Sequence, residues 1–167
     1  MEENTAVKIL KGAVLLEIRG KSFYQKIAND TESEAVRNFF EQMAGEEEKH
    51  IKALSHQYRM YQANKKFDPD SIPAGEQSDP AQKVLSDQIK EQISAAGFES
   101  AAIAAAMAME RDAIQYYSAR AAESEDDGEK ALYKWLANWE SGHLDMLADI
   151  DKSLRQEIWQ DNQFWPF

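Results

Sequence analysis

One pattern occurs twice in this chain of 167 residues and constrains its fold more than any other feature. Each copy has a lone glutamate followed by a Glu-x-x-His motif: Glu17, Glu47 and His50, and then Glu110, Glu140 and His143. The two glutamates of a copy are 30 residues apart in both cases, so an offset of 93 maps the first copy onto the second. The repeat predicts two similar halves that contribute equally to one shared site.

The residue types in the repeat are those of a metal-binding helix bundle. Bundles that hold two iron or two manganese ions use a lone Glu from each of two helices and a Glu-x-x-His motif from each of the other two. Residues three apart on a helix lie on the same side, so both side chains of each Glu-x-x-His pair can bind at one metal site. The repeat therefore predicts that all six residues are metal ligands.

The apolar residues around the motifs place them inside the bundle. The same three offsets before each motif carry side chains typical of a core: Phe40, Met43 and Ala44, and then Tyr133, Leu136 and Ala137. Four buried carboxylates would cost several kcal/mol per ion if nothing compensated their charge. Two divalent cations would neutralise them, and oxygen and nitrogen ligands without sulfur suit iron or manganese better than copper.

The composition argues against several other classes of function. The chain has no cysteine, which excludes disulfides, iron-sulfur clusters and thiolate zinc sites within it. Its formal net charge of −11 argues against a nucleic-acid partner, because proteins that bind nucleic acids display clustered Lys and Arg. The N-terminal segment contains Lys8, Lys11, Glu17 and Arg19, which are too many charges for a signal peptide or a membrane span. We therefore expect a cytoplasmic protein.

The pattern along the chain predicts an all-α fold in a single domain over residues 1–167. Apolar spacing and helix-forming composition predict four long helices, at about 5–29, 31–64, 98–123 and 125–160. Short links join the first and the second pair of helices, and a long crossover at about 65–97 joins the pairs. This arrangement is typical of a ferritin-like four-helix bundle with one crossover. A short extra helix, from about Pro80 to Ser94, is expected before the third long helix.

Start signals of the helices repeat with the same offset as the ligands. Thr31 with Glu34 has the spacing of a capping box, which predicts Thr31 as the N-cap of the second helix. Adding 93 to these positions gives Ser124 and Asp127, at the expected start of the fourth helix. The duplication therefore extends from the ligands to the secondary structure.

Four aromatic residues near the repeat have two interpretations each. Tyr24 and Tyr117 follow the lone glutamates by seven residues, about two helical turns. Their phenols are placed to hydrogen-bond a ligating carboxylate, and packing in the core explains them equally well. Trp135 and Trp139 flank the second motif, where filling of the core is favoured over electron transfer.

The remaining charged residues near the motifs are expected at the surface. Glu46, Glu48 and Lys49 are assigned to a charged outer face of their helix. His56 has no histidine counterpart, because the offset of 93 leads to an aspartate, and it is expected at the surface or partly packed. The apolar tail FWPF at 164–167 is expected to pack on the bundle or on a second subunit.

The motifs resemble those of the rubrerythrin-like branch of the ferritin-like superfamily. The segments that carry the resemblance are LLEIRGKSFY with AGEEEKH, and AMERDAIQYY with NWESGH, within a bundle that extends from Thr5 to Gln160. The resemblance implies two iron ions per chain, with manganese or zinc as substitutes, bridged by Glu47 and Glu140. It also implies one terminal pair of ligands per ion: Glu17 with His50, and Glu110 with His143.

The resemblance further implies an activity and partners. Proteins of this branch react with hydrogen peroxide or dioxygen at a diferrous centre, and a carrier returns the electrons. A rubredoxin-like iron domain with cysteine ligands is part of full-length rubrerythrins, whereas this chain has no cysteine, so we expect a separate electron donor. We also expect a homodimer.

One ligand position departs from the family pattern. Rubrerythrins have an additional Glu three residues after the ligand of the third helix, and here that position is Ala113. The symmetric set of six ligands is closer in this respect to bacterioferritin. Two alternatives to the oxidoreductase therefore stay open, a ferritin-like ferroxidase for iron storage and a non-catalytic metal-binding bundle.

Overall fold

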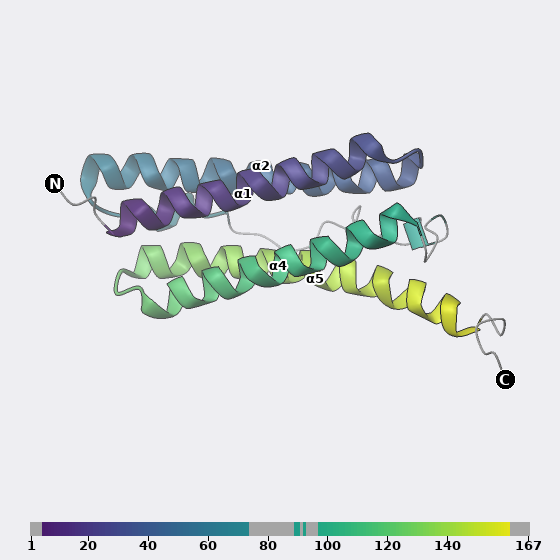
Figure 1. Ribbon diagram of the computed structural model, residues 1–167. Coiled ribbons are helices and arrows are strands. Elements are labelled where there is room, and N and C mark those ends of the chain that lie inside the picture. Colours follow the sequence, from purple (N-terminus) through teal and green to yellow (C-terminus); the bar gives the residue numbers. More distant parts are fainter. Residues whose placement is uncertain (1–4, 74–88, 91, 93–96, 161–167) are drawn as a thin grey trace.

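The computed structural model describes residues 5–73, 89–90, 92 and 97–160, with side chains to residue 156. Its elements are four long helices and one short 3-10 helix: α1 Thr5–Asp30, α2 Glu34–Asn64, η1 Pro69–Ser71, α4 Phe98–Glu123 and α5 Asp127–Gln160. Figure 1 shows α1 and α2 as one antiparallel pair that lies along a second pair, α4 and α5. The predicted all-α, ferritin-like four-helix bundle is confirmed, with the helix ends within three residues of those expected.

The start of α2 differs from the prediction. Its N-cap is Ser33, whose hydroxyl accepts a hydrogen bond from the Val36 N–H at 3.3 Å. The prediction of Thr31 as N-cap is wrong. The Thr31 hydroxyl instead accepts a hydrogen bond from the Ser33 N–H at 3.2 Å and donates one to Glu99 of α4 at 2.9 Å. Thr31 therefore joins the turn before α2 to the other helix pair.

The start of α5 shows the same local structure. The Asp126 carboxylate accepts from the Glu129 N–H at 2.8 Å, as Ser33 accepts from the residue three positions later. Ser124 ends α4 as its C-cap, with its N–H bonded to the Arg120 carbonyl at 3.0 Å. Ser33 and Asp126 are themselves 93 residues apart, so the duplication includes the caps, two positions later than predicted.

The apolar core consists of two clusters with the polar residues of the repeat between them along the helices. On α1, Leu10 and Ala13 belong to one cluster, and Tyr24 and Ile27 to the other. Glu17 lies between these two pairs in the sequence and is 2% exposed. The bundle therefore holds its polar centre between two apolar layers, which shield the centre from water along the bundle axis.

The beginning of the crossover is attached to both helix pairs. Buried Gln57 of α2 hydrogen-bonds both backbone groups of Asp68, at 2.7 Å to the carbonyl and 2.9 Å from the N–H. Phe67 is buried in the apolar cluster that contains Leu10 and Ala13, and η1 contacts α5. His56, expected at the surface or partly packed, is partly exposed and pairs with the Asp68 carboxylate at 3.1 Å.

Gly128 of α5 leaves room for the beginning of the crossover to pack against α5. Its replacement by alanine is expected to destabilise the fold by about 1–3 kcal/mol. An added Cβ would lie 2.9 Å from the Phe67 Cβ and 3.1 Å from the Asp126 Oδ1. Thermal unfolding measures the effect. Gly45→Ala is the control, because that Cβ would meet nothing within 4 Å and a helical Gly→Ala exchange should stabilise by about 0.5–1 kcal/mol. A Gly128→Ala variant as stable as the parent would contradict the close packing.

Two predictions fall outside the described residues. The first is the short helix expected at about 80–94. Within that range the structure describes only residues 89, 90 and 92, of which 89 and 90 are helical. The second is the apolar tail at 164–167, and the single-domain organisation stays a prediction. Among residues 5–73 and 97–160, none of the helices combines the length and hydropathy needed to cross a bilayer.

Candidate metal centre

The six residues of the repeat converge in the middle of the bundle. All are buried, with at most 3% of any residue exposed, and they come from all four long helices: Glu17, Glu47, His50, Glu110, Glu140 and His143. Their ligand atoms form two groups, and within each group these atoms lie within 4.8 Å of one another. One group has Glu17 and His50 at its end, and the other has Glu110 and His143. Glu47 and Glu140 belong to both groups.

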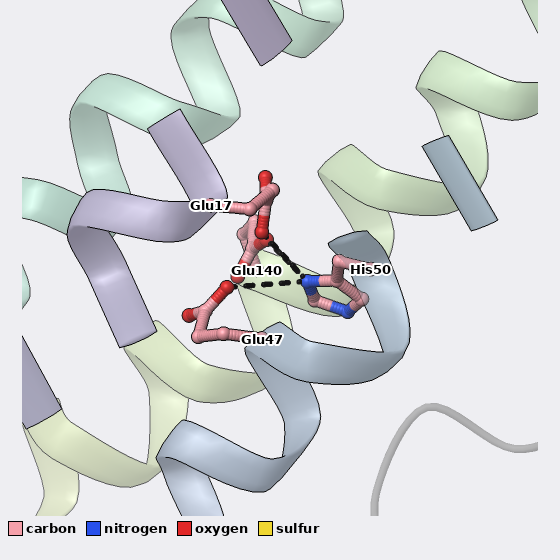
Figure 2. Close-up of side chains that lie close together, drawn as sticks. All are labelled: Glu17, Glu47, His50 and Glu140. Carbon is pink, nitrogen blue, oxygen red and sulfur yellow. Dashed lines mark hydrogen bonds and ion pairs between the residues drawn. The ribbon is translucent and has the colours of Figure 1, made fainter. Parts of the chain in front are cut away.

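The first group surrounds one nitrogen of His50. Its Nδ1 lies 3.0 Å from Glu17 Oε2, 3.0 Å from Glu140 Oε1 and 3.4 Å from Glu47 Oε2 (Figure 2). Three helices therefore direct carboxylate oxygens at one imidazole nitrogen. A cation at this place would find four donors of the nitrogen and oxygen type.

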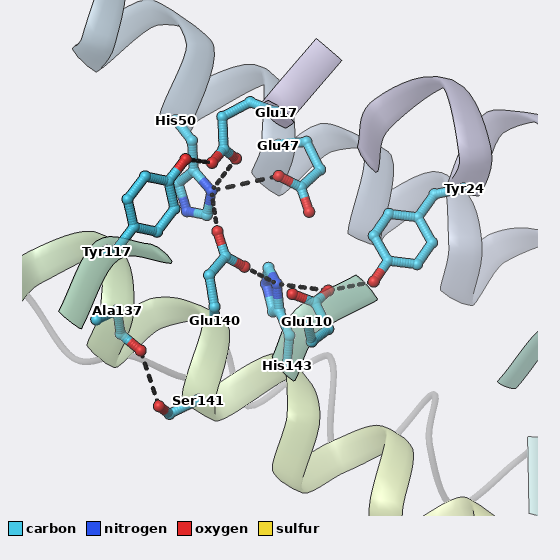
Figure 3. A network of polar contacts seen from close by, with 10 residues as sticks. All are labelled: Glu17, Tyr24, Glu47, His50, Glu110, Tyr117, Ala137, Glu140, Ser141 and His143. Atoms are coloured by element: carbon cyan, nitrogen blue, oxygen red, sulfur yellow. Dashed lines mark hydrogen bonds and ion pairs between the residues drawn. The ribbon is translucent and has the colours of Figure 1, made fainter. Parts of the chain in front are cut away.

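The second group is built in the same way on the other half. The Nδ1 of His143 lies 3.0 Å from Glu140 Oε2 and 3.6 Å from Glu110 Oε1. Glu140 thus directs one oxygen to each histidine, as Figure 3 shows. A carboxylate with one oxygen in each group has the placement that a bridge between two cations requires.

Two buried tyrosines connect the halves crosswise. The phenol of Tyr24 on α1 donates to Glu110 on α4, and the phenol of Tyr117 on α4 donates to Glu17 on α1 (Figure 3). Burial and then the charge of the carboxylate partner raise the pKa of both phenols well above 10.0, so both keep their protons. Both lone glutamates are therefore held in place by a donor from the opposite pair of helices.

Burial and close charges shift the pKa values of five of the six residues. Burial and the charge of Glu140 raise the pKa of Glu47 well above its usual value, and the same causes raise that of Glu110 to about 7. Burial opposes the charged form of Glu140, but His50 and His143 outweigh it and lower its pKa. Burial opposes the charged histidines too, yet the carboxylates raise the pKa of His50 and bring that of His143 to about 9. The clustered carboxylates thus favour positive charge at the centre, which two cations would supply.

The donor set fits two divalent cations. Both histidines direct Nδ1 to the carboxylates, while their Nε2 atoms are buried without a hydrogen-bond partner in the described part of the chain. With the proton on Nε2, each Nδ1 offers a lone pair to an ion. Two ions with a charge of +2 would balance four carboxylates, and the oxygen and nitrogen donors suit iron or manganese.

Glu46 does not lie on the charged outer face that the sequence predicted. The residue is 3% exposed, and Lys49 donates to its Oε1 at 2.7 Å, whereas Glu48 is only partly buried. A signal for this burial is present in the sequence, because the position 93 residues later is Trp139. The repeat thus relates Glu46 to a residue that packs against the centre.

The two tryptophans of the second motif lie against His50. Their ring centroids are 5.5 Å (Trp135) and 5.7 Å (Trp139) from that of the imidazole, both in edge arrangements. Both indoles are partly buried, and Trp135 packs against the apolar cluster that contains Leu10 and Ala13, in line with the predicted filling of the core.

Comparison with known proteins identifies the family. The model of the rubrerythrin family matches residues 8–151, a range that contains all six side chains of the centre and both tyrosines. Searches of curated proteins and of solved structures returned no match. The family match covers most of the chain and agrees with the fold and with the buried carboxylate and histidine groups, so the chain belongs to the rubrerythrin family.

Proposed function

We propose that the chain is a di-iron oxidoreductase that reduces hydrogen peroxide or dioxygen with electrons from a separate carrier. One observation carries the proposal, namely that two buried groups of donors share Glu47 and Glu140. A site for a single ion needs no shared carboxylates. A pair of redox-active ions can deliver two electrons together, which is the number that peroxide needs to become water.

Each residue of the centre has a role in the proposal. The two shared glutamates would bridge the ions, and each remaining pair would complete one site: Glu17 with His50, and Glu110 with His143. Two ferrous ions would supply the two electrons. The tyrosines orient the lone glutamates through hydrogen bonds that place each carboxylate for its ion. The apolar clusters on both sides keep bulk water from the reacting atoms.

The return of electrons has to come from outside the described centre. The chain contains no cysteine, so a thiolate-ligated iron site within it cannot provide them. We propose a small one-electron carrier of the rubredoxin-like kind as the partner. We propose a homodimer as the assembly and the cytoplasm as the location.

Anaerobic reaction of the ferrous protein with peroxide tests the proposal. One equivalent of peroxide per two ferrous ions should oxidise the protein rapidly and completely, as followed by its optical spectrum. Sustained consumption of peroxide should then require an added carrier and its reductase. The variant Glu110→Ala should lose the rapid oxidation while its circular dichroism stays unchanged, and the exposed Glu41→Ala is the matched control. A ferrous protein that neither peroxide nor dioxygen oxidises would refute the proposal.

An iron-storage ferroxidase is the second candidate, and Ala113 is the observation that favours it. This residue is 6% exposed and occupies the position where rubrerythrins have an additional glutamate. Storage needs a closed shell of many subunits around a cavity, whereas the oxidoreductase needs only a small assembly. The mass in solution, and the number of ferric ions retained per chain after aerobic loading, distinguish the two. A metal-binding bundle without turnover would bind two ions and oxidise neither with peroxide.

A further inference from the structure

The aromatic environment of the centre breaks the symmetry of the duplication. Trp135 and Trp139 lie against His50. The residues 93 positions earlier, which belong to the other half of the repeat, are Gln42 and Glu46. The six ligand positions repeat without change, but the two indoles occur on one side only. Their presence is therefore not explained by the ligand pattern.

Three rings form a continuous contact from a proposed ligand toward the surface. The imidazole of His50 is in edge contact with both indoles, and the centroids of Trp135 and Trp139 are 5.6 Å apart. His50 is completely buried, while both indoles are partly exposed. Since electron transfer weakens steeply with distance, rings in contact are a favourable route between the buried centre and the solvent.

The tyrosines of the centre, unlike the two tryptophans, are not exposed to solvent. Tyr24 and Tyr117 are both 0% exposed, and their hydroxyls are bonded to Glu110 and Glu17. A phenol can also donate an electron, but a radical on either tyrosine would be enclosed in the core. The tryptophan pair alone, among the aromatic residues shown here in contact with the centre, reaches the surface.

We propose that Trp135 and Trp139 donate an electron to the His50 side of the centre when the metal supplies fewer than the two electrons that reduction of peroxide needs. This inference rests on the proposed function. Reduction of peroxide to two waters consumes two electrons and two protons. With two ferrous ions, the metals provide both electrons. With one ferrous ion, the indole pair provides the second electron. The Nε1 of Trp135 is buried without a hydrogen-bond partner in the described part of the chain, so the proton leaves to water from the partly exposed Trp139, which becomes a neutral indolyl radical.

The donor pair prevents a partly loaded centre from releasing a hydroxyl radical. A one-electron reduction of peroxide by a single ferrous ion yields hydroxide and a hydroxyl radical. An electron from the adjacent indole converts the latter to hydroxide before it attacks the core. The indolyl radical at the surface can then be reduced by a small reductant, or it is trapped by dioxygen as oxygenated tryptophan.

Partial loading with iron tests the proposal directly. Protein with one ferrous ion per chain and protein with two are each mixed with one equivalent of peroxide per chain in aerobic buffer. Peptide mass spectrometry should find oxygenated tryptophan at 135 and 139, several-fold more after loading with one ion than with two. Freeze-quenched samples should show a tryptophan radical by electron paramagnetic resonance. The radical should disappear in the double variant Trp135→Phe with Trp139→Phe.

Matched samples separate this route from unspecific damage. Trp159→Phe changes a residue of α5 that comes 20 positions after Trp139 in the sequence, and this variant should keep the radical. Metal-free protein treated with peroxide gives the background oxidation. The double variant should still bind two metal ions, because no ligand is changed, and this measurement confirms that its centre is intact.

The possible failures are distinguishable. If the ferrous protein is oxidised by peroxide but the oxidation falls on Tyr24 and Tyr117, or equally on Trp159, the tryptophan pair is not the donor and the proposed function stands. If the radical persists in the double variant, the inference is overturned as well. If peroxide leaves the ferrous protein unoxidised at either loading, the proposed function fails and the inference fails with it.

Discussion

Replacement of Glu47 and Glu140 together by alanine is expected to abolish the binding of both metal ions and to leave the bundle folded. Each of the two residues belongs to both groups of donors, so the double variant leaves only one carboxylate and one histidine per ion. Two such ligands bind a divalent ion too weakly, in competition with its hydration, to retain it at micromolar protein concentration. The parent protein should bind two ions per chain.

Elemental analysis after reconstitution with ferrous iron and removal of unbound metal measures the loss. The matched control replaces two exposed carboxylates on the same helices, Glu41→Ala on α2 with Asp145→Ala on α5. That control should still bind two ions per chain. If the Glu47 and Glu140 double variant retains two ions, the bridging assignment is wrong, and one ion per chain in the parent would contradict it equally.

Removal of the metal from the parent protein should lower its melting temperature by about 8–16 °C near neutral pH. Ions present at a thousand times their dissociation constant stabilise the folded state by about 4 kcal/mol, and in a domain of this size 1 kcal/mol corresponds to about 2–4 °C. The buried carboxylates add to the effect, because without cations they repel each other. Thermal unfolding with iron, and after chelation, measures the difference.

The metal-free protein should recover part of this stability when the pH falls from 8 to 6. The pKa of Glu110 is raised to about 7 and that of His143 to about 9, so the folded state holds more protons than the unfolded chain over this range. Stability from these groups is present at low pH and is lost as the pH rises through their folded pKa values. The lowered pKa of Glu140 has the opposite effect, but only once the pH falls into the range in which an unfolded glutamate takes up its proton, which lies below pH 6.

The expected recovery is about 1–3 kcal/mol, because the two groups are coupled and their effects are not additive. Melting curves of the chelated protein at pH 6 and pH 8 measure it. The double alanine variant serves as the control and should show a smaller pH dependence, since it lacks the charge of Glu140 that acts on both groups. Identical melting with and without metal at both pH values would mean that the carboxylates are not a buried, charged cluster.

Local features of the sequence were sufficient to predict the helices and the membership of the centre. A helix has 3.6 residues per turn, so residues three and seven apart share a side wherever the helix lies in the fold. The offset of 93 relates two such sets, and one shared site between matching halves follows. This is why the four long helices and the convergence of six polar residues were predictable from the sequence.

The capping residue of α2 was decided by the packing of the helix pairs. Thr31 and Ser33 both have a hydroxyl that can cap a helix, and the local sequence does not distinguish them. In the fold, the Thr31 hydroxyl donates a hydrogen bond to Glu99 of α4 and accepts one from the Ser33 N–H in the turn, whereas the Ser33 hydroxyl accepts from the first turn of α2 and is the cap. The choice depends on a residue 68 positions away in the sequence.

The sequence pattern did not predict the contacts between the two helix pairs either. Periodicity places Tyr24, Tyr117 and Glu46 on the sides of their helices, but it does not state which side faces which neighbour. Only the tertiary structure decides that each phenol bonds the glutamate of the opposite half and that two indoles lie against His50. The physical reason is that helix periodicity is set by backbone hydrogen bonds within one element. The partners of a side chain, by contrast, are set by the relative rotation and separation of elements distant in sequence.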